Sequence, residues 1–358
     1  MILSLCPAPA LDSTVHLPVL ELGESLRIDP PVVRAGGKGL NVARVLASRG
    51  RQVRLLAPLG GATGDRLVAE FSATAVASSW LPVAAPTRMS TAMVEASGRT
   101  TVLNERAGAL SSAEWERWFA ALGDFIEAAR SSTSHSDADA APGAGAGAGA
   151  GATPAAGAAP QRGIAPDAGV PGPVATVSGS WPEATPADVV RETVQALVRA
   201  GIYTVADTSG PLLLVAAEAG ASLLKPNEEE LRQATGEPTL SAGLARLFDL
   251  GAGSVLLSRG EAGMSHYTRS DRLGLHARLD AVLSGNPTGA GDAGVAGWLA
   301  AVEPLGRAPE GAERSAALAQ AVAWSASAVE APLAGDLGPR TDALLERVLF
   351  TSAPTALE

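Results

Sequence analysis

The chain has few of the residues that would mark it as disulfide-bonded, metal-binding or nucleic-acid-binding. It contains one cysteine, Cys6, so no intramolecular disulfide can form, and its four histidines lack the spacing of a metal site. Acidic residues outnumber basic ones by 37 to 27, and no arginine-rich tract offsets the net charge of −10. This composition argues against a nucleic-acid partner.

Aromatic residues and long apolar runs are also scarce. Aromatics make up 4% of the 358 residues, so alanine, leucine and valine must build most of the core, with Cys6 expected inside it. The apolar start, residues 1–6, is too short for a signal peptide or a membrane span. We therefore expect a cytoplasmic protein with no membrane partner, long enough to bury a substantial core.

The most informative segment is 286–294, which reads Asn-Pro-Thr-Gly-Ala-Gly-Asp-Ala-Gly. Gly289 and Gly291 permit a tight turn with outward-facing amides, and an apolar helix expected over 295–302 adds its positive dipole end. Such a turn suits a phosphate, and Asp292 beside it could accept the proton of an attacking hydroxyl. The same letters fit a structural turn or a dinucleotide-binding turn, although the latter should follow an early strand.

Two further motifs place polar residues at helix starts. Residues 36–41 read Gly-Gly-Lys-Gly-Leu-Asn and lead into a helix expected over 41–48. Lys38 offers a mobile cation and Asn41 an amide, which suit an anionic group and hydroxyls on a small polar ligand. In 223–231 a buried strand gives way to a helix at Asn227, where Asn227 and Glu230 fit a capping box. Taken alone, the first motif also fits a turn with a solvated lysine, and the second a plain helix cap.

In this order along the chain, and with Ser258 to Gly263 preceding the last, the three motifs resemble the signature of the ribokinase-like (PfkB) sugar kinases. The segments Ala10-Leu11-Asp12, Asn41-Val42-Ala43 and Thr87-Arg88 are similar to the branch of 1-phosphofructokinases and tagatose-6-phosphate kinases. The resemblance implies an α/β three-layer sandwich with a mostly parallel central sheet flanked by helices, plus a small β-sheet lid. It also implies ATP and Mg²⁺ as cofactors, and fructose 1-phosphate or tagatose 6-phosphate as the substrate.

The resemblance also implies roles for individual residues. Asp292 would be the general base, and the backbone of Gly289, Ala290 and Gly291 would form an anion hole. Substrate binding is implied for Asp12, Gly37, Lys38, Asn41, Arg88, Glu105 and Ser180. Nucleotide binding is implied for Lys225, Asn227, Ser258, Gly260, Gly263 and Asn286. Asn227 and Glu230 would hold the magnesium, Glu230 through water, while Arg88 and Lys38 would hold the phosphate that the sugar already carries.

Two departures from the branch pattern affect the expected sugar pocket. The branch usually has Asn-Pro-Ala-Leu-Asp near its start, where this chain has Ala8 in place of the asparagine and so lacks one side-chain amide. The branch also tends to follow its Asn-Glu pair with Pro-Gly-Pro, whereas here Arg106 follows Glu105. We expect this loop to shape the pocket differently and to add a cation.

Strand-like and helical segments alternate along most of the chain, which predicts a parallel sheet covered on both faces. Strands are expected at 2–6, 53–57, 174–177, 203–206, 222–224 and 254–257. The lid is expected at 13–33 and 87–105, and the core at 1–12, 34–86 and 106–358. Within the core, residues 131–173 are rich in glycine and alanine and are expected to be a disordered insert.

Three functions remain open at this point. The leading one is an ATP-dependent kinase that phosphorylates a phosphohexose. A non-catalytic sugar-phosphate-binding regulator of the same fold would have no need of a base such as Asp292. A kinase for a neutral sugar or nucleoside would leave Lys38 and Arg88 without an anionic partner. The motifs do not choose the hexose, and a homodimer through the lid, a contact that some family members form, stays an open alternative.

Overall fold

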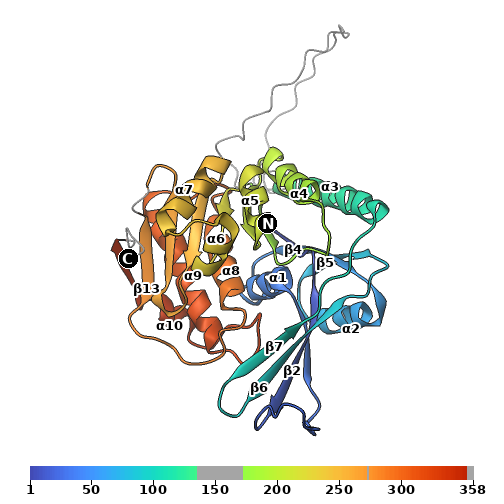
Figure 1. The fold of residues 1–358 in the computed structure, drawn as a ribbon. Helices are drawn as coiled ribbons and strands as arrows, with labels where there is room; N and C mark the ends of the chain where they lie inside the picture. The colour runs from blue at the N-terminus through green and yellow to red at the C-terminus, as the bar shows by residue number, and fades with distance from the viewer. Residues whose placement is uncertain (135–171, 272–273, 353–358) are drawn as a thin grey trace, which may run out of the picture.

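The computed structural model describes residues 1–134, 172–271 and 274–352, which form a large sheet between two layers of helices and a second, smaller sheet (Figure 1). The strands of the large sheet are β1 Ile2–Leu5, β4 Val53–Leu59, β5 Ala77–Pro82, β8 Val174–Ser178, β9 Tyr203–Asp207, β10 Leu223–Leu224, β11 Ser254–Ser258, β12 Met264–Thr268, β13 Leu275–Leu279 and β14 Val348–Ser352. Their order is β14-β13-β12-β11-β10-β9-β8-β1-β4-β5. In this spatial order, the neighbouring strands from β11 through β10, β9, β8, β1 and β4 to β5 pair in parallel. The pairs β11–β12, β12–β13 and β13–β14 are antiparallel.

The central strands are apolar on both faces, as parallel strands covered by helices must be. All four residues of β1 are buried. Ile2 belongs to one apolar cluster, whereas Leu3 and Leu5 belong to another, because successive side chains of a strand point to opposite faces. Cys6, at the end of β1, is buried as predicted. The sheet therefore separates two cores.

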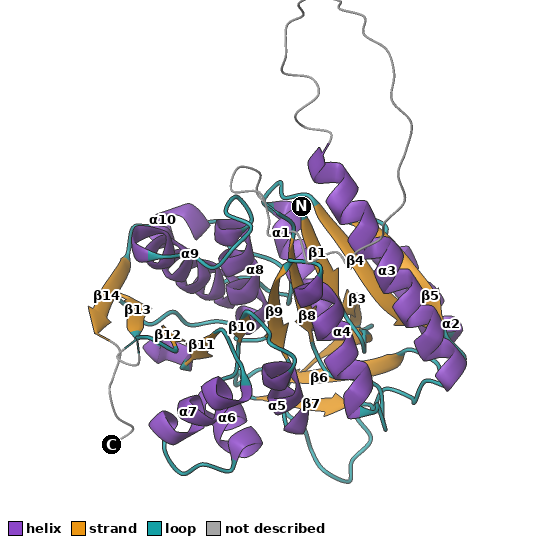
Figure 2. Cartoon of the chain, turned by 90° about the horizontal axis from the view of Figure 1, so that it is seen from above, coloured by secondary structure: helices purple, strands orange, loops and turns teal. Residues whose placement is uncertain are grey.

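Each core is closed by its own layer of helices. One cluster receives buried residues from α1 Lys38–Ser48, α2 Gly61–Phe71, α8 Ala290–Val302, α9 Gly311–Val329 and α10 Thr341–Leu345. The other receives them from α3 Ser112–Ser134, α4 Ala187–Arg199, α5 Pro211–Glu218, α6 Glu228–Thr235 and α7 Leu240–Leu250. Figure 2 shows α8 and α9 on one side of the sheet and α5, α6 and α7 on the other. The predicted three-layer α/β sandwich is confirmed.

A separate small sheet, the lid, projects from this core (Figure 1). Its strands are β2 Ala10–Leu17, β3 Val32–Gly36, β6 Arg88–Glu95 and β7 Thr100–Asn104, in the order β3-β2-β6-β7. β2 and β6 run parallel, with Asp12 opposite Ser90, and the two outer pairs are antiparallel. The expectation of a second, smaller sheet is therefore confirmed.

Most of the predicted insert, 131–173, lies outside the described residues. The part that is described begins as helix, because α3 continues to Ser134, so the expected start of the insert at residue 131 was too early. The Ser131 hydroxyl donates to Glu127 O at 3.0 Å, a bond that is compatible with helical backbone.

No helix in the described parts of the chain combines the length and apolar character that a membrane span requires.

Candidate functional site

The candidate site lies at the carboxyl ends of the central parallel strands, where several helices begin. β9 ends at Asp207, β10 is followed at once by Lys225, and α1, α6 and α8 start with Lys38, Glu228 and Ala290. In open α/β sheets this edge is where ligands bind, because helix N-termini and strand ends meet there.

Two glycine turns start α1 and α8, which belong to the same helix layer and both begin at this edge. Gly37 (φ 103°) and Gly289 (φ 84°) are the N-caps of α1 and α8. A side chain at Gly289 would also come within 3.0 Å of Ala334, so both backbone angle and space require glycine there. The helix starts predicted from the sequence, residues 41 and 295, were wrong, because α1 begins at Lys38 and α8 at Ala290. The small and polar residues of these first turns do not show the apolar period by which a helix is predicted. Lys38 and Asp292 therefore lie in first helical turns.

Asp292 is a buried carboxylate tied to the other glycine-turn motif. Its side chain accepts a hydrogen bond from Asn41 Nδ2 at 2.8 Å, and both residues are 6% exposed. Burial raises the pKa of Asp292 to about 6; the Asp207 charge adds to this rise, while Lys38, Asn41 and Lys225 oppose it. A carboxylate with this pKa is mostly ionised at neutral pH and accepts protons more readily than an ordinary aspartate.

Asp207 joins the two lysines of the site, and the sequence motifs did not point to it. It is fully buried and accepts a hydrogen bond from Lys38 Nζ at 2.9 Å, while Lys225 Nζ lies 3.6 Å from the same oxygen. Burial alone would raise the pKa of Asp207, but the Lys225 and Lys38 charges hold it below its ordinary value. The one sequence signal was an acidic residue at the end of an otherwise uncharged strand, 203–207.

Lys38 is anchored rather than a free surface cation. Its side chain is 34% exposed, and Glu230 lies 3.9 Å from its ammonium group in addition to the Asp207 contact. Burial opposes the charged form, yet Asp207, Asp292 and Glu230 together raise the pKa of Lys38 above its ordinary value. Lys38 therefore stays protonated and partly accessible to a ligand.

Lys225 lies beside the start of α8. A Cβ atom built on Gly291 would be 3.4 Å from Lys225 Nζ, so this ammonium group lies against the first helical turn. Ala290 N donates to Pro287 O at 3.1 Å, whereas the described residues provide no acceptor for the amides of Gly291 and Asp292. Two amide donors and one ammonium group thus meet at the N-terminus of α8, an arrangement suited to an anion.

The predicted capping box at the start of α6 is confirmed. Asn227 Oδ1 accepts from Glu230 N at 2.7 Å, and Asn227 N donates to Glu230 Oε2 at 2.8 Å. Ser258 lies beside this cap, since it forms a parallel bridge with Asn227 and its amide donates to Pro226 O at 3.1 Å. The structure therefore brings Lys225, Asn227, Glu230 and Ser258 together at neighbouring strand ends.

The other residues predicted to bind the nucleotide lie in loops near these strand ends, and each has a local structural role. Gly260 opens a short 3₁₀ turn, η1 Gly260–Ala262, and a side chain there would point into open space. Gly263 (φ 95°) packs so closely on β13 that a Cβ atom would collide with Ala277 O. Asn286 holds the turn before α8, accepting from Thr288 N at 3.0 Å and donating to Pro332 O at 3.2 Å.

The predicted substrate residues lie partly in the lid. Asp12 on β2 has its pKa raised to about 6, mainly by burial, with Arg88 opposing the rise and Asp292 adding to it. Arg88 begins β6, and its Nη1 donates to Glu105 O at 3.4 Å. The Glu105 carboxylate accepts from Met89 N at 2.7 Å. Charge thus couples Asp12 to both Arg88 and Asp292.

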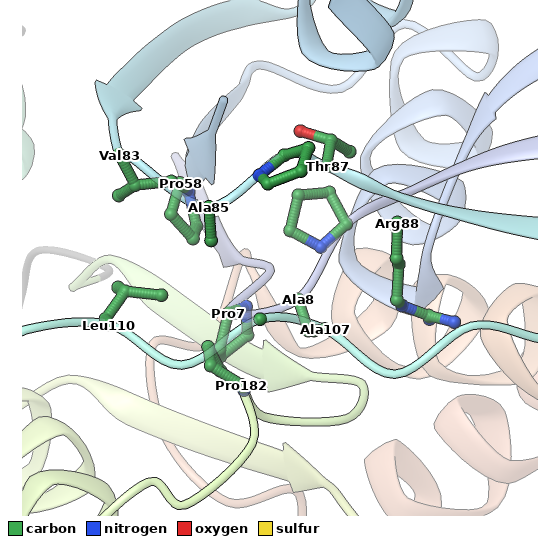
Figure 3. A pocket seen from close by; sticks show the side chains of 13 residues that line it. Pro7, Ala8, Pro58, Val83, Ala85, Thr87, Arg88, Ala107, Leu110 and Pro182 are labelled. Atoms are coloured by element: carbon green, nitrogen blue, oxygen red, sulfur yellow. The ribbon is translucent and has the colours of Figure 1, made fainter. Parts of the chain in front are cut away.

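Arg88, Glu105 and Ser180 meet in one cavity of about 400 Å³, whose wall also includes Asn104, Arg106, Ala107, Trp181 and Glu183. A second cavity of about 20 Å³ shares Arg88 and Ala107 with it (Figure 3). Ala8, which stands where the resembled branch has asparagine, lines this smaller cavity. Both departures from the branch pattern therefore lie next to Arg88.

Comparison with known proteins gives consistent matches over most of the chain. The model of the pfkB family of carbohydrate kinases matches residues 10–140 and 172–339. A 1-phosphofructokinase of Xanthomonas campestris pv. campestris is 30% identical over 82% of this chain and 81% of its own length. A 1-phosphofructokinase of Haloferax volcanii is 28% identical over 85% and 84%. The crystal structure of phosphofructokinase-2 from Escherichia coli in complex with potassium is 22% identical, covers 96% of this chain and 98% of that one, and superposes with a TM-score of 0.76.

The chain belongs to the pfkB family of carbohydrate kinases, because the family model spans most of its length. This confirms the resemblance drawn from the glycine turns and the Lys-Pro-Asn segment. The chain is accordingly an enzyme that transfers a phosphoryl group to a hydroxyl, with ATP as the donor implied by the family. The likeness to the Escherichia coli structure bears on the fold alone.

Proposed function

We propose that the chain transfers the γ-phosphoryl group of ATP to a hydroxyl of a phosphohexose, with fructose 1-phosphate the first candidate and tagatose 6-phosphate the second. The observation that carries this is the position of Asp292: a buried carboxylate, of pKa about 6, in the same helical turn as two amides without acceptors in the described structure. The relatives described as 1-phosphofructokinases favour fructose 1-phosphate.

In the proposed reaction Asp292 accepts the proton of the attacking hydroxyl. The hydroxyl oxygen bonds to the γ-phosphorus as the bond to the β–γ bridging oxygen breaks, and ADP leaves. The amides of Gly291 and Asp292, together with Lys225, face the charge that develops on the transferred group. Of the predicted anion hole, Ala290 contributes less, since its amide already donates to Pro287. Asn41 orients the base through its hydrogen bond.

The residues predicted to lie near the nucleotide phosphates fit a hydrated Mg²⁺ that binds together with ATP. The described residues hold no cluster of three or more acidic, histidine or cysteine side chains that could bind a metal alone. Mg²⁺ uses one or two carboxylates, keeps several waters and binds substrate phosphates. Asn227 and Glu230 would hold it, Glu230 through water, and Asp207 Oδ2 is a buried oxygen with no partner in the described structure. When bound, the ion neutralises phosphate charge.

The proposed substrate site spans the lid and the start of α1. Asp12, Asn41 and the Gly37 turn would bind sugar hydroxyls, and Ser180 would lie along the sugar. Arg88 and Lys38 would hold the existing phosphate. The lid would exclude water, which otherwise competes with the sugar for the phosphoryl group.

The test of this function is ADP release from Mg-ATP with fructose 1-phosphate, tagatose 6-phosphate, fructose 6-phosphate, fructose and ribose, each alone. We expect turnover with a phosphohexose and none with fructose or ribose. Turnover only with a neutral sugar would mean that Arg88 and Lys38 have another role. Tight binding of a phosphohexose without turnover would favour a non-catalytic regulator.

We expect activity to fall below about pH 6, because the raised pKa of Asp292 leaves it protonated there and unable to accept a proton. kcat should drop about tenfold for each pH unit on this acidic limb. Asp12 has a similar pKa, so Asp12→Asn is the control, and it should keep the limb in kcat. A flat kcat profile between pH 5 and 7.5 would rule out Asp292 as the base.

We further propose that the chain forms a homodimer through the lid. Most exposed large apolar side chains of the described residues lie there, among them Leu22 (89% exposed) and Leu103 (59%). Exposed apolar patches of this kind mark contact surfaces. Leu103→Lys should shift the chain from dimer to monomer in sedimentation velocity, whereas Leu349→Lys, on the edge strand β14, should not. A monomeric wild type at micromolar concentration would contradict the proposal.

A further inference from the structure

Arg88 lines the larger cavity without a directly paired carboxylate. Among the ion pairs of the described residues none includes Arg88, and its buried Nε has no acceptor. Its one hydrogen bond, to Glu105 O, is long at 3.4 Å. A guanidinium group carries five donors, so several remain for a ligand. The cavity, of about 400 Å³, is within the size range of small-molecule sites.

Arg106 brings a second guanidinium group to the same cavity. It pairs with Glu183 at 3.0 Å, and the two side chains are 84% and 55% exposed. Glu183 N also donates to Ala107 O at 2.8 Å, so the loop after β7 and the loop after β8 are joined beside the cavity. Because exposed ion pairs contribute little to stability, the Arg106–Glu183 pair opens at little cost.

The wall beneath these loops is rigid. Trp181 is 8% exposed and its ring lies 6.3 Å from that of Trp115 and 6.4 Å from that of Trp118. Its Nε1 has no acceptor within the described part of the chain. A ligand in the cavity would therefore lie against a fixed indole, which also gives a fluorescence signal for binding.

The geometry points to Arg106 as a further anion-binding residue beside Arg88, one that determines specificity for a substrate that already carries a phosphate. This inference rests on the proposed function and adds to it a residue that the family motifs do not include. A phosphate group has a charge of about −1.5 to −2 at neutral pH and accepts paired hydrogen bonds from arginine. Arg88 and Lys38 together would leave part of this charge unbalanced, because Asp207 already pairs with Lys38. The phosphate replaces Glu183 as the partner of Arg106, since it offers more charge than one carboxylate.

Both departures from the branch pattern favour recognition of the phosphate by charge. Ala8 provides no neutral donor to the small cavity beside Arg88, and Arg106 provides a cation to the large one. Recognition of the phosphate therefore depends on charge more than on neutral hydrogen bonds. An uncharged sugar would leave both guanidinium groups without a ligand partner.

Arg106→Ala tests this directly. We expect KM for the phosphohexose to rise about ten- to hundredfold, with kcat within about twofold and KM for ATP unchanged, because a charge-assisted hydrogen bond is lost only at the phosphate. The KM of Arg106→Lys should lie between those of the wild type and Arg106→Ala, since lysine keeps the charge but lacks the paired donors of the guanidinium group. Glu183→Gln should lower KM, because it removes the competing carboxylate. Arg307→Ala removes another exposed, paired arginine and should change nothing.

Tryptophan fluorescence titration with inorganic phosphate, without ATP, separates this inference from the proposed function. Weaker phosphate binding by Arg106→Ala supports the inference even if no phosphohexose is turned over, an outcome that would overturn the proposed function alone. Unchanged KM and unchanged phosphate binding in Arg106→Ala would overturn the inference and leave the kinase assignment intact.

Discussion

Asp292→Asn should fold normally and lose about 10²- to 10⁴-fold in turnover, the range that a positioned base contributes. Asparagine has nearly the same shape and keeps an oxygen to accept from Asn41, but its amide cannot take the proton of the attacking hydroxyl. Stability should not fall. The pKa of Asp292 is higher in the folded state than its ordinary value, so the ionised carboxylate present at neutral pH makes the folded state less stable, and a neutral amide removes that cost.

The measurement is kcat with the preferred phosphohexose, alongside thermal unfolding of the same preparations. Asp342→Asn is the matched control, because the exposed Asp342 pairs with Arg49, the C-cap of α1, at the end of this helix opposite the glycine turn. It should keep wild-type kcat. Near wild-type turnover in pure Asp292→Asn would show that another group accepts the proton.

Asp207→Ala should give the largest loss of stability, about 3–5 kcal/mol, the cost of removing one partner from a buried ion pair. The change leaves Lys225, whose side chain is 4% exposed, and Lys38 without their shared carboxylate. It should also lower the pKa of Asp292, since the Asp207 charge contributes to raising it. Remaining activity should therefore extend to lower pH than in the wild type.

Urea unfolding at several pH values checks this expectation. The pKa of Asp207 is lowered in the folded protein, so its stabilising contribution is present above its ordinary value of 3.8 and is lost as the pH falls through the folded value. The gap between wild type and Asp207→Ala should thus narrow in acid. Asp342→Asn, which removes an exposed partner of Arg49, should cost less than about 1 kcal/mol. Wild-type stability in Asp207→Ala would mean that the three charges are not coupled.

The features predictable from the sequence are those with local signals. The apolar strands, the glycine turns before α1 and α8, and the capping box of Asn227 and Glu230 each depend on residues a few positions apart. The helix starts were predicted too late because the polar residues of a first turn do not follow the apolar period.

The contacts that organise the site join residues far apart in the chain. Lys38 and Asp207 are 169 positions apart, and Asn41 and Asp292 are 251 apart. Contacts between residues so far apart in the chain produce no recognisable pattern in a single sequence. Asp207 was missed for this reason, and Lys38 was interpreted as a mobile cation although Asp207 and Glu230 anchor it. The meeting of Arg88 and Arg106 in one cavity likewise depends on the packing of the β7 and β8 loops.

The central claim, that Asp292 supports phosphoryl transfer from ATP to a phosphohexose, is tested most directly by ³¹P NMR. Wild-type protein and Asp292→Asn are incubated with Mg-ATP and fructose 1-phosphate, and the products are observed without coupling enzymes. The account predicts ADP and a second sugar phosphate resonance in equal amounts with the wild type, and neither with the variant over the same time. Equal product from both proteins would contradict the account.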